Sequence, residues 1–263
     1  MIIDIQFNQG SATWGQLRDA VLAAEDSGFR TAWIADHLSG GVMNAPSMPE
    51  CFAVLGALAA STKTIGLGSL VANVGNRHPG LLANAAATVQ NISSGRFILG
   101  IGAGASPNST FAQEQNALGI ELPATIAQRH TRLEHTLDVI EEIWSPTRDD
   151  KFDAFPRPEQ DVPIIVGVNS VALARIAGAR TNGINVRASH PQRGQILAEA
   201  IGAAALGKGV ADFDVSVWDW FDESLLDPQS QQRRQFQLEG VNRIILLMRG
   251  APDIARLEEA PVS

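Results

Sequence analysis

The chain has 263 residues, of which 45% are hydrophobic and 18% charged, as in an ordinary folded globular protein. Its net charge of −8 argues against broad binding to nucleic acid or to an anionic membrane, because both need a basic face. No apolar run reaches the ~20 residues of a membrane span, and the first residues lack the basic start of a signal peptide. A lone cysteine, Cys51, excludes a disulfide within this chain, so we expect a cytoplasmic protein.

Apolar runs typical of strands alternate with stretches of helical period along the chain. The runs are nearly continuous in apolar residues, which is typical of strands buried on both faces of a parallel sheet. We expect eight strands, at 2–7, 31–35, 64–71, 96–101, 162–166, 183–187, 214–220 and 241–248. Helices are expected between them, at 14–27, 50–60, 79–92, a stretch ending at 144, 171–179, 192–206, 228–238 and 253–259.

Eight strand–helix units in a chain of this length predict a (β/α)8 barrel, the TIM barrel, as a single domain over residues 1–263. A doubly wound open sheet is the alternative, although it usually has fewer strands arranged in two halves. Two long irregular stretches, 104–123 and 144–160, flank the fourth helix, and loops of that length are often functional. The chemistry of such a barrel lies where its strands end, so the residues after each strand are the candidates.

Two polar pairs follow the second and third expected strands. His37, after Asp36, is a candidate acid or base because imidazole is easily poised for proton transfer near neutral pH. Alternatively, its ring bonds only to the loop backbone. Arg77 could bind an anionic cofactor group, or it could pack against or cap the neighbouring loops. His78 is expected to pack nearby or to cap the helix that starts at Pro79.

Glycines and an anion-binding loop mark two further strand ends. Alternating glycines at 100, 102 and 104 clear one face of the chain, where a flat ring system could lie close to the backbone. Residues 167–170 follow the fifth strand and open a helix, whose N–H groups suit a phosphate. Asn169 or Ser170 could also serve as the cap of that helix. Arg187 ends the sixth strand and adds a positive charge.

The remaining cysteine, histidine and acidic residues indicate no other type of site. No metal-ligand spacing, nucleophile elbow or phosphate-binding Walker loop occurs. Cys51 is expected to pack in the core. His130 and His135 are expected to face solvent, because positions five apart on a helix do not share a face. The acidic and aromatic stretch 218–223 is a candidate pocket wall.

Long stretches of the chain carry a family signature: AEDSGFRTAWIADH, LGALAASTKTIGLGSLVANVGNRHP and NISSGRFILGIGAG, followed by VPIIVGVNSVALARIAGARTNGINV and EGVNRIILL. Together they resemble the flavin-dependent luciferase-like monooxygenases, a family that includes oxidoreductases using the deazaflavin coenzyme F420. The resemblance runs almost unbroken from about residue 17 to residue 104 and then resumes. It implies a (β/α)8 barrel that holds the isoalloxazine or deazaflavin ring at its C-terminal mouth.

The resemblance also assigns expected roles to individual residues. It places His37 at the position of an active-site acid or base. It implies a cis peptide between Leu70 and Val71, in a bulge that backs the cofactor ring, and it makes Asn108 a cofactor contact. The other expected cofactor contacts are Asp36, Gly104, Gly167, Val168, Asn169 and Arg187. No residue is expected to bind a metal.

Two departures from the family pattern limit what the resemblance implies. Members that act on sugar phosphates have tryptophan where this chain has Gly41, and glutamate where it has Ala105. We therefore do not expect the sugar-phosphate substrate. The favoured function is hydride transfer between F420 and a small organic substrate. A monooxygenase using flavin mononucleotide (FMN) and a non-catalytic flavin- or deazaflavin-binding protein are the alternatives. Family members also suggest a homodimer, formed through the alanine-rich helices near the second and third strands.

Overall fold

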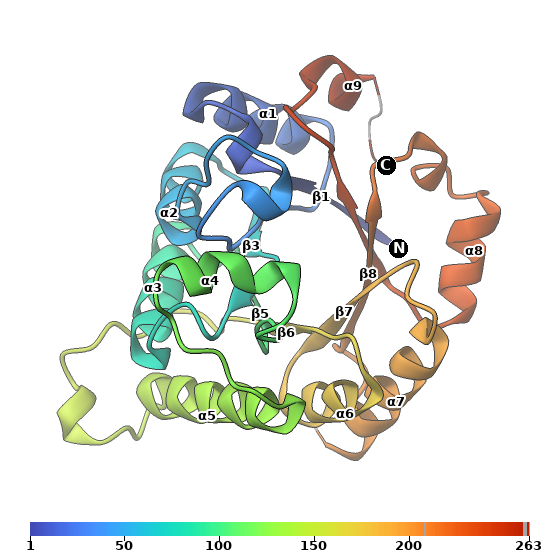
Figure 1. Cartoon of the computed structure of the whole chain (residues 1–263). Coiled ribbons are helices and arrows are strands. Elements are labelled where there is room, and N and C mark those ends of the chain that lie inside the picture. The colour runs from blue at the N-terminus through green and yellow to red at the C-terminus, as the bar shows by residue number, and fades with distance from the viewer. Residues whose placement is uncertain (208, 260–261, 263) are drawn as a thin grey trace.

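The computed structural model describes residues 1–207, 209–259 and 262. Its parallel strands close into a barrel, around which the helices form a ring (Figure 1). Around the barrel the order is β3-β2-β1-β9-β8-β7-β6-β5, and pairing of β3 with β5 closes it. The strands are β1 Ile2–Phe7, β2 Thr31–Ile34, β3 Gly66–Ser69, β4 Ala72–Asn73, β5 Phe97–Gly102, β6 Ile164–Gly167, β7 Gly183–Arg187, β8 Asp214–Trp220 and β9 Arg243–Leu247. The expected (β/α)8 barrel is confirmed.

One expected strand is divided in two. The run 64–71 was expected to be continuous, but the structure places β3 and β4 on either side of Leu70 and Val71. The peptide bond between these two residues is cis, as expected, and both pieces pair with β5. The two pieces therefore occupy one position of the eight-membered barrel. The division displaces Leu70 and Val71 from the regular ladder at its C-terminal end.

The helices follow the expected order with one addition. They are α1 Trp14–Asp26, α2 Cys51–Ser61, α3 Pro79–Ile92, α4 Gln113–Ala117, α5 Ile126–Trp144, α6 Val171–Arg180, α7 Arg193–Leu206, α8 Gln231–Leu238 and α9 Ile254–Glu258. The irregular stretch 104–123 was expected to lack regular structure, but it contains α4. This short helix has no apolar stripe, because its two buried residues are Glu114 and Gln115. Figure 1 shows it across one end of the barrel.

Local sequence signals fix the helix starts. Thr13 and Thr125 each form a capping box with the glutamine three residues later, at the starts of α1 and α5. Pro79 occupies the first turn of α3, where a missing N–H costs nothing. None of the helices that the structure describes is both long and apolar enough to cross a membrane.

Polar side chains close the N-terminal end of the barrel. The indole of Trp33 is fully buried and donates to Asp4 Oδ2 at 2.7 Å. Arg243 bridges that oxygen, at 2.6 Å, and Asp214 Oδ2, at 2.7 Å. Burial raises the pKa of Asp4 to about 6, although Arg243 opposes the shift. A Cβ atom at Gly68 would lie 2.3 Å from the Trp33 ring, so the backbone of β3 must pass it without a side chain.

Candidate active site

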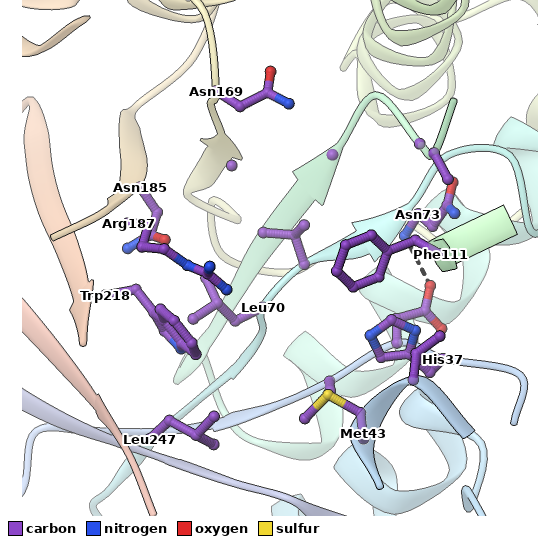
Figure 2. A pocket seen from close by; sticks show the side chains of 18 of the residues that line it. His37, Met43, Leu70, Asn73, Phe111, Asn169, Asn185, Arg187, Trp218 and Leu247 are labelled. Atoms are coloured by element: carbon purple, nitrogen blue, oxygen red, sulfur yellow. Dashed lines mark hydrogen bonds between the residues drawn. The ribbon is translucent and has the colours of Figure 1, made fainter. Parts of the chain in front are cut away.

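A cavity of about 1020 Å³ opens at the C-terminal end of the barrel, where its walls come from the ends of all the strands. This volume is at the upper end of those typical for sites that bury a cofactor or a drug-sized ligand. Figure 2 shows its two sides. His37, Met43 and Phe111 lie on one side, whereas Arg187 and Trp218 lie on the other. Leu70 lies between them.

The floor of the cavity is the displaced bulge of Leu70 and Val71. A Cβ atom at Gly102 would lie 2.7 Å from Val71 Cγ2, and one at Gly167 would lie 3.0 Å from Val71 Cγ1. At Gly100, a Cβ atom would lie 2.0 Å from the carbonyl oxygen of Ser69. Gly100 and Gly102 were expected to clear a face of the chain for a flat ring, and Gly167 was expected in the phosphate-binding loop. Instead they admit the neighbouring strand and its bulge, which presents Leu70 and Val71 to the cavity.

Gly104 and Asn73 form the edge of this floor. Gly104 lines the cavity with φ of +86°, a conformation that favours glycine. The Asn73 side chain lies beside it and accepts from the N–H of Gly75 at 2.8 Å. Asn108, in contrast, is exposed and is not among the residues that line the cavity.

His37 is held by an acid that the sequence did not indicate. Its Nδ1 lies 2.9 Å from Glu114 Oε1, and the side chain of Glu114 is only 2% exposed. Glu114 Oε2 accepts from the N–H groups of Leu38 and Ser39, at 2.8 and 3.1 Å. Burial opposes ionisation of Glu114, but the hydrogen bonds from His37 and the two N–H groups outweigh it and hold the pKa of this carboxyl below its ordinary value. The alternative in which His37 bonds only to the loop backbone is wrong.

The neighbouring pair, Asp36 and Arg77, is engaged within the protein. Arg77 donates to both carboxylate oxygens of Asp36, at 2.7 and 2.8 Å, and also contacts Glu50. The N–H of Asn73 donates to Asp36 as well, at 2.8 Å. Asp36 lines the cavity, but Arg77 does not. Of the two alternatives for Arg77, the structure supports the structural one. His78 caps α3 as expected, accepting from the N–H of Gly80 at 3.1 Å.

The loop between β6 and α6 provides a second polar wall. Gly167, Val168 and Asn169 all line the cavity. The hydroxyl of Ser170 caps α6 by accepting from the N–H of Leu173 at 3.3 Å. The Asn169 side chain therefore does not cap the helix, and it has no hydrogen-bond partner within the described ranges. Figure 2 shows it far from His37, at the other end of the cavity.

Arg187 and Trp218 form the wall opposite His37. The Arg187 guanidinium lies over the indole ring, 5.0 Å from its centroid. Trp218 Nε1 donates to the side-chain oxygen of Gln6, whose Nε2 donates to the carbonyl of Leu70 at 3.2 Å. This chain of contacts ties the wall to the floor. Arg249 is stacked in the same way, 4.0 Å from the centroid of the Trp220 ring.

The helix α5 contributes residues to the cavity wall, one of which was expected to face solvent. His130 was expected to face solvent, but it is 9% exposed and lines the cavity together with Arg129. It lies on the first turns of α5, which reach the mouth of the barrel. Burial lowers the pKa of His130, and Arg129 adds to the shift. Cys51 is buried as expected, and burial raises the pKa of its thiol. No three His, Cys, Asp or Glu residues of the described chain are grouped to hold a metal ion.

Comparison with known proteins identifies related sequences. The family model for luciferase-like monooxygenase matches residues 3–218. An F420-dependent glucose-6-phosphate dehydrogenase of Nakamurella multipartita is 33% identical over 178 residues, which cover 64% of this chain and 50% of the relative. A 5,10-methylenetetrahydromethanopterin reductase of Archaeoglobus fulgidus is 30% identical over 210 residues, 76% of this chain and 58% of the relative. The chain thus spans about half the length of the curated relatives it matches.

Solved structures show the same fold. An F420-dependent secondary alcohol dehydrogenase in complex with an F420–acetone adduct matches with a TM-score of 0.77 and 18% identity. The match covers 99% of this chain and 97% of that one. The coenzyme F420-dependent tetrahydromethanopterin reductase of Methanopyrus kandleri matches with a TM-score of 0.76 and 19% identity, over 98% of this chain and 96% of that one. At these identities the likeness concerns the fold.

Proposed function

The chain belongs to the luciferase-like monooxygenase family, and on this premise we propose that it is an oxidoreductase that moves a hydride between coenzyme F420 and a small organic substrate. The observation that carries the proposal is one cavity with an orientated histidine on one side and a phosphate-type loop on the other. The similarity to an F420-dependent glucose-6-phosphate dehydrogenase supports the same cofactor.

The residues present fit a deazaflavin with a phosphate-bearing tail. The apolar bulge of Leu70 and Val71 offers a flat ring a surface without competing polar groups. Asn169 and the N–H groups at the start of α6 suit the phosphate, and Arg187 adds a positive charge to the same cavity. When bound, the cofactor would supply the hydride chemistry, while the protein supplies binding and orientation.

His37 would move the proton that accompanies hydride transfer. Nδ1 of the ring is hydrogen-bonded to Glu114, whereas Nε2 has no hydrogen-bond partner in the part of the chain that the structure describes. Because the ring lines the cavity, Nε2 can take a proton from a substrate hydroxyl or return one to a carbonyl. Phe111 lies beside the ring, with 6.5 Å between the ring centroids and an interplanar angle of 22°.

A cofactor titration tests the proposal. Purified protein is titrated with oxidised F420 and, separately, with FMN, and cofactor and tryptophan fluorescence are followed. We expect saturable F420 binding that is at least about tenfold tighter than FMN binding. Tighter FMN binding would favour the monooxygenase alternative. F420 binding without turnover of alcohols, or of ketones with the reduced cofactor, would favour a binding protein.

The assembly and location of the protein are part of the same proposal. Leu81 and Ile92 on α3 are 62% and 47% exposed. A homodimer through α2 and α3 would cover this face. Light scattering at micromolar concentration should give twice the 28.0 kDa of the chain, and a mass of 28.0 kDa would contradict the dimer. The lone cysteine favours the cytoplasm.

A further inference from the structure

We propose that Glu114 is a positioning residue for His37, which fixes the proton of the imidazole on Nδ1 and so leaves Nε2 as the proton acceptor that faces the cavity. The inference rests on the proposed function for the role of His37 in catalysis. The tautomer itself follows from contacts within the chain and can be measured without any substrate.

The carboxylate of Glu114 is surrounded by hydrogen-bond donors. Oε2 accepts the two backbone N–H groups of Leu38 and Ser39, and Oε1 lies 2.9 Å from His37 Nδ1. A further contact comes from the Gln115 amide, whose Nε2 lies 3.3 Å from Oε1. A carboxylate that accepts several hydrogen bonds stays ionised, and an ionised carboxylate has no proton to donate in a hydrogen bond. The nitrogen facing it must therefore carry a proton, and in the neutral ring the proton is then absent from Nε2.

Glu114 is the charged group that acts on this ring. Asp36 is next to His37 in the chain, but Arg77 holds both of its oxygens. The other titratable groups that line the cavity are Arg129, His130, Arg187 and Arg249, none of which forms an ion pair or hydrogen bond with Glu114 or His37 within the described ranges. Glu114 is thus the residue whose removal should change the protonation of the ring.

Short anchors keep the acid in place. Gln115 is fully buried and donates to Asn76 Oδ1 at 2.9 Å, which fastens α4 to the loop before α3. Glu114 in turn holds the backbone of residues 38–39, so one side chain orients both His37 and the segment that follows it. Partners of this kind, which orient a functional histidine, change activity by about 10–100-fold when they are removed from metal sites.

The imidazole tautomer tests the inference directly. Protein carrying ¹⁵N-labelled histidine is studied by NMR at a pH where His37 is neutral, and each resonance is assigned by a His→Gln variant. We expect the wild-type ring of His37 to carry its proton on Nδ1. A wild-type ring with the proton on Nε2 would overturn the proposal, whatever any variant does.

The variant Glu114→Gln removes the charge at nearly constant shape. We expect a mixed tautomer population for His37 and a kcat at least about tenfold lower, with the F420 Kd changed less than about threefold. Glu114→Asp, which keeps the charge, should retain the Nδ1 proton. Glu121→Gln, the same change at an exposed acid nearby in the chain, is the control and should alter neither. An unchanged tautomer in folded Glu114→Gln would contradict the proposal, whereas failure of wild-type protein to bind F420 would contradict only the proposed function.

Discussion

The guanidinium of Arg187 stacks on Trp218, 5.0 Å from the ring centroid, and in the described part of the chain it has no carboxylate partner. Arg249 is placed in the same way on Trp220. The two acids that line the cavity, Asp36 and Glu114, are both engaged by donors of the protein itself. The cavity of this acidic chain therefore offers unpaired positive charge, which suits the anionic part of a ligand.

Replacing Arg187 by alanine should weaken cofactor binding. A hydrogen bond to a charged group contributes about 1.5–3 kcal/mol, so the F420 Kd should rise roughly 10–100-fold. Arg187→Lys should recover only part of the affinity, because lysine keeps the charge but loses the planar stack on Trp218. Arg175→Ala serves as the control, since Arg175 lies on the outer face of α6 and pairs with Glu199. A fluorescence titration that gives an unchanged F420 Kd for Arg187→Ala would show that this residue does not contribute to cofactor binding.

Asp4 should make stability depend on pH in an unusual direction. Burial raises its pKa in the folded state to about 6, above the ordinary 3.8. The folded protein therefore holds this proton more tightly than the unfolded chain, and stability is lost as pH rises from about 4 to about 6. The free energy of unfolding of the wild type, relative to Asp4→Asn, should fall by on the order of 2–3 kcal/mol between pH 4 and pH 7.

Urea denaturation at several pH values measures this difference. Asp26→Asn, which changes an exposed aspartate at the end of α1, is the matched control. A wild type that gains stability over Asp4→Asn as pH rises would mean that Arg243 and Trp33 outweigh the cost of burying the charge.

Gly68 should not tolerate a side chain. Its Cβ atom would lie 2.3 Å from the fully buried ring of Trp33, which Asp4 holds in place. Gly68→Ala should therefore lower the free energy of unfolding by about 1–3 kcal/mol, a typical cost of overpacking. Gly202→Ala is the control: it lies within α7 with open space around it, and alanine there should stabilise by about 0.5–1 kcal/mol. Equal effects of the two substitutions in chemical denaturation would exclude a tight contact at Trp33.

The sequence allowed prediction of the barrel and of the strand ends that line the cavity, because both follow from the period of apolar residues along the chain. It did not indicate Glu114, since the contact with His37 joins residues 77 positions apart and α4 has no apolar stripe. Ala105 stands where sugar-phosphate members have glutamate, whereas the acid that contacts His37 in the structure comes from α4. The exposed position expected for His130 was wrong because α5 extends to the mouth of the barrel.

Sequence spacing also could not distinguish glycines that make room for a ligand from glycines that make room for a neighbouring part of the chain. Positions 100, 102 and 104 alternate as expected for a cleared face. The structure shows that Gly100 faces Ser69 at the end of β3 and Gly102 faces Val71 in the bulge that follows it, whereas Gly104 adopts a positive φ beside Asn73. The difference lies in the bulge at Leu70 and Val71, which local periodicity does not reveal.

The role of His37 is tested most directly by measuring kcat for His37→Ala with F420 at saturating concentration. A positioned acid or base typically contributes about 10²–10⁴-fold to the rate, so kcat should fall at least about tenfold while the F420 Kd changes less than about fivefold. Equal changes in both would make His37 a cofactor-positioning residue. An unchanged kcat would contradict proton transfer by His37 at this cavity.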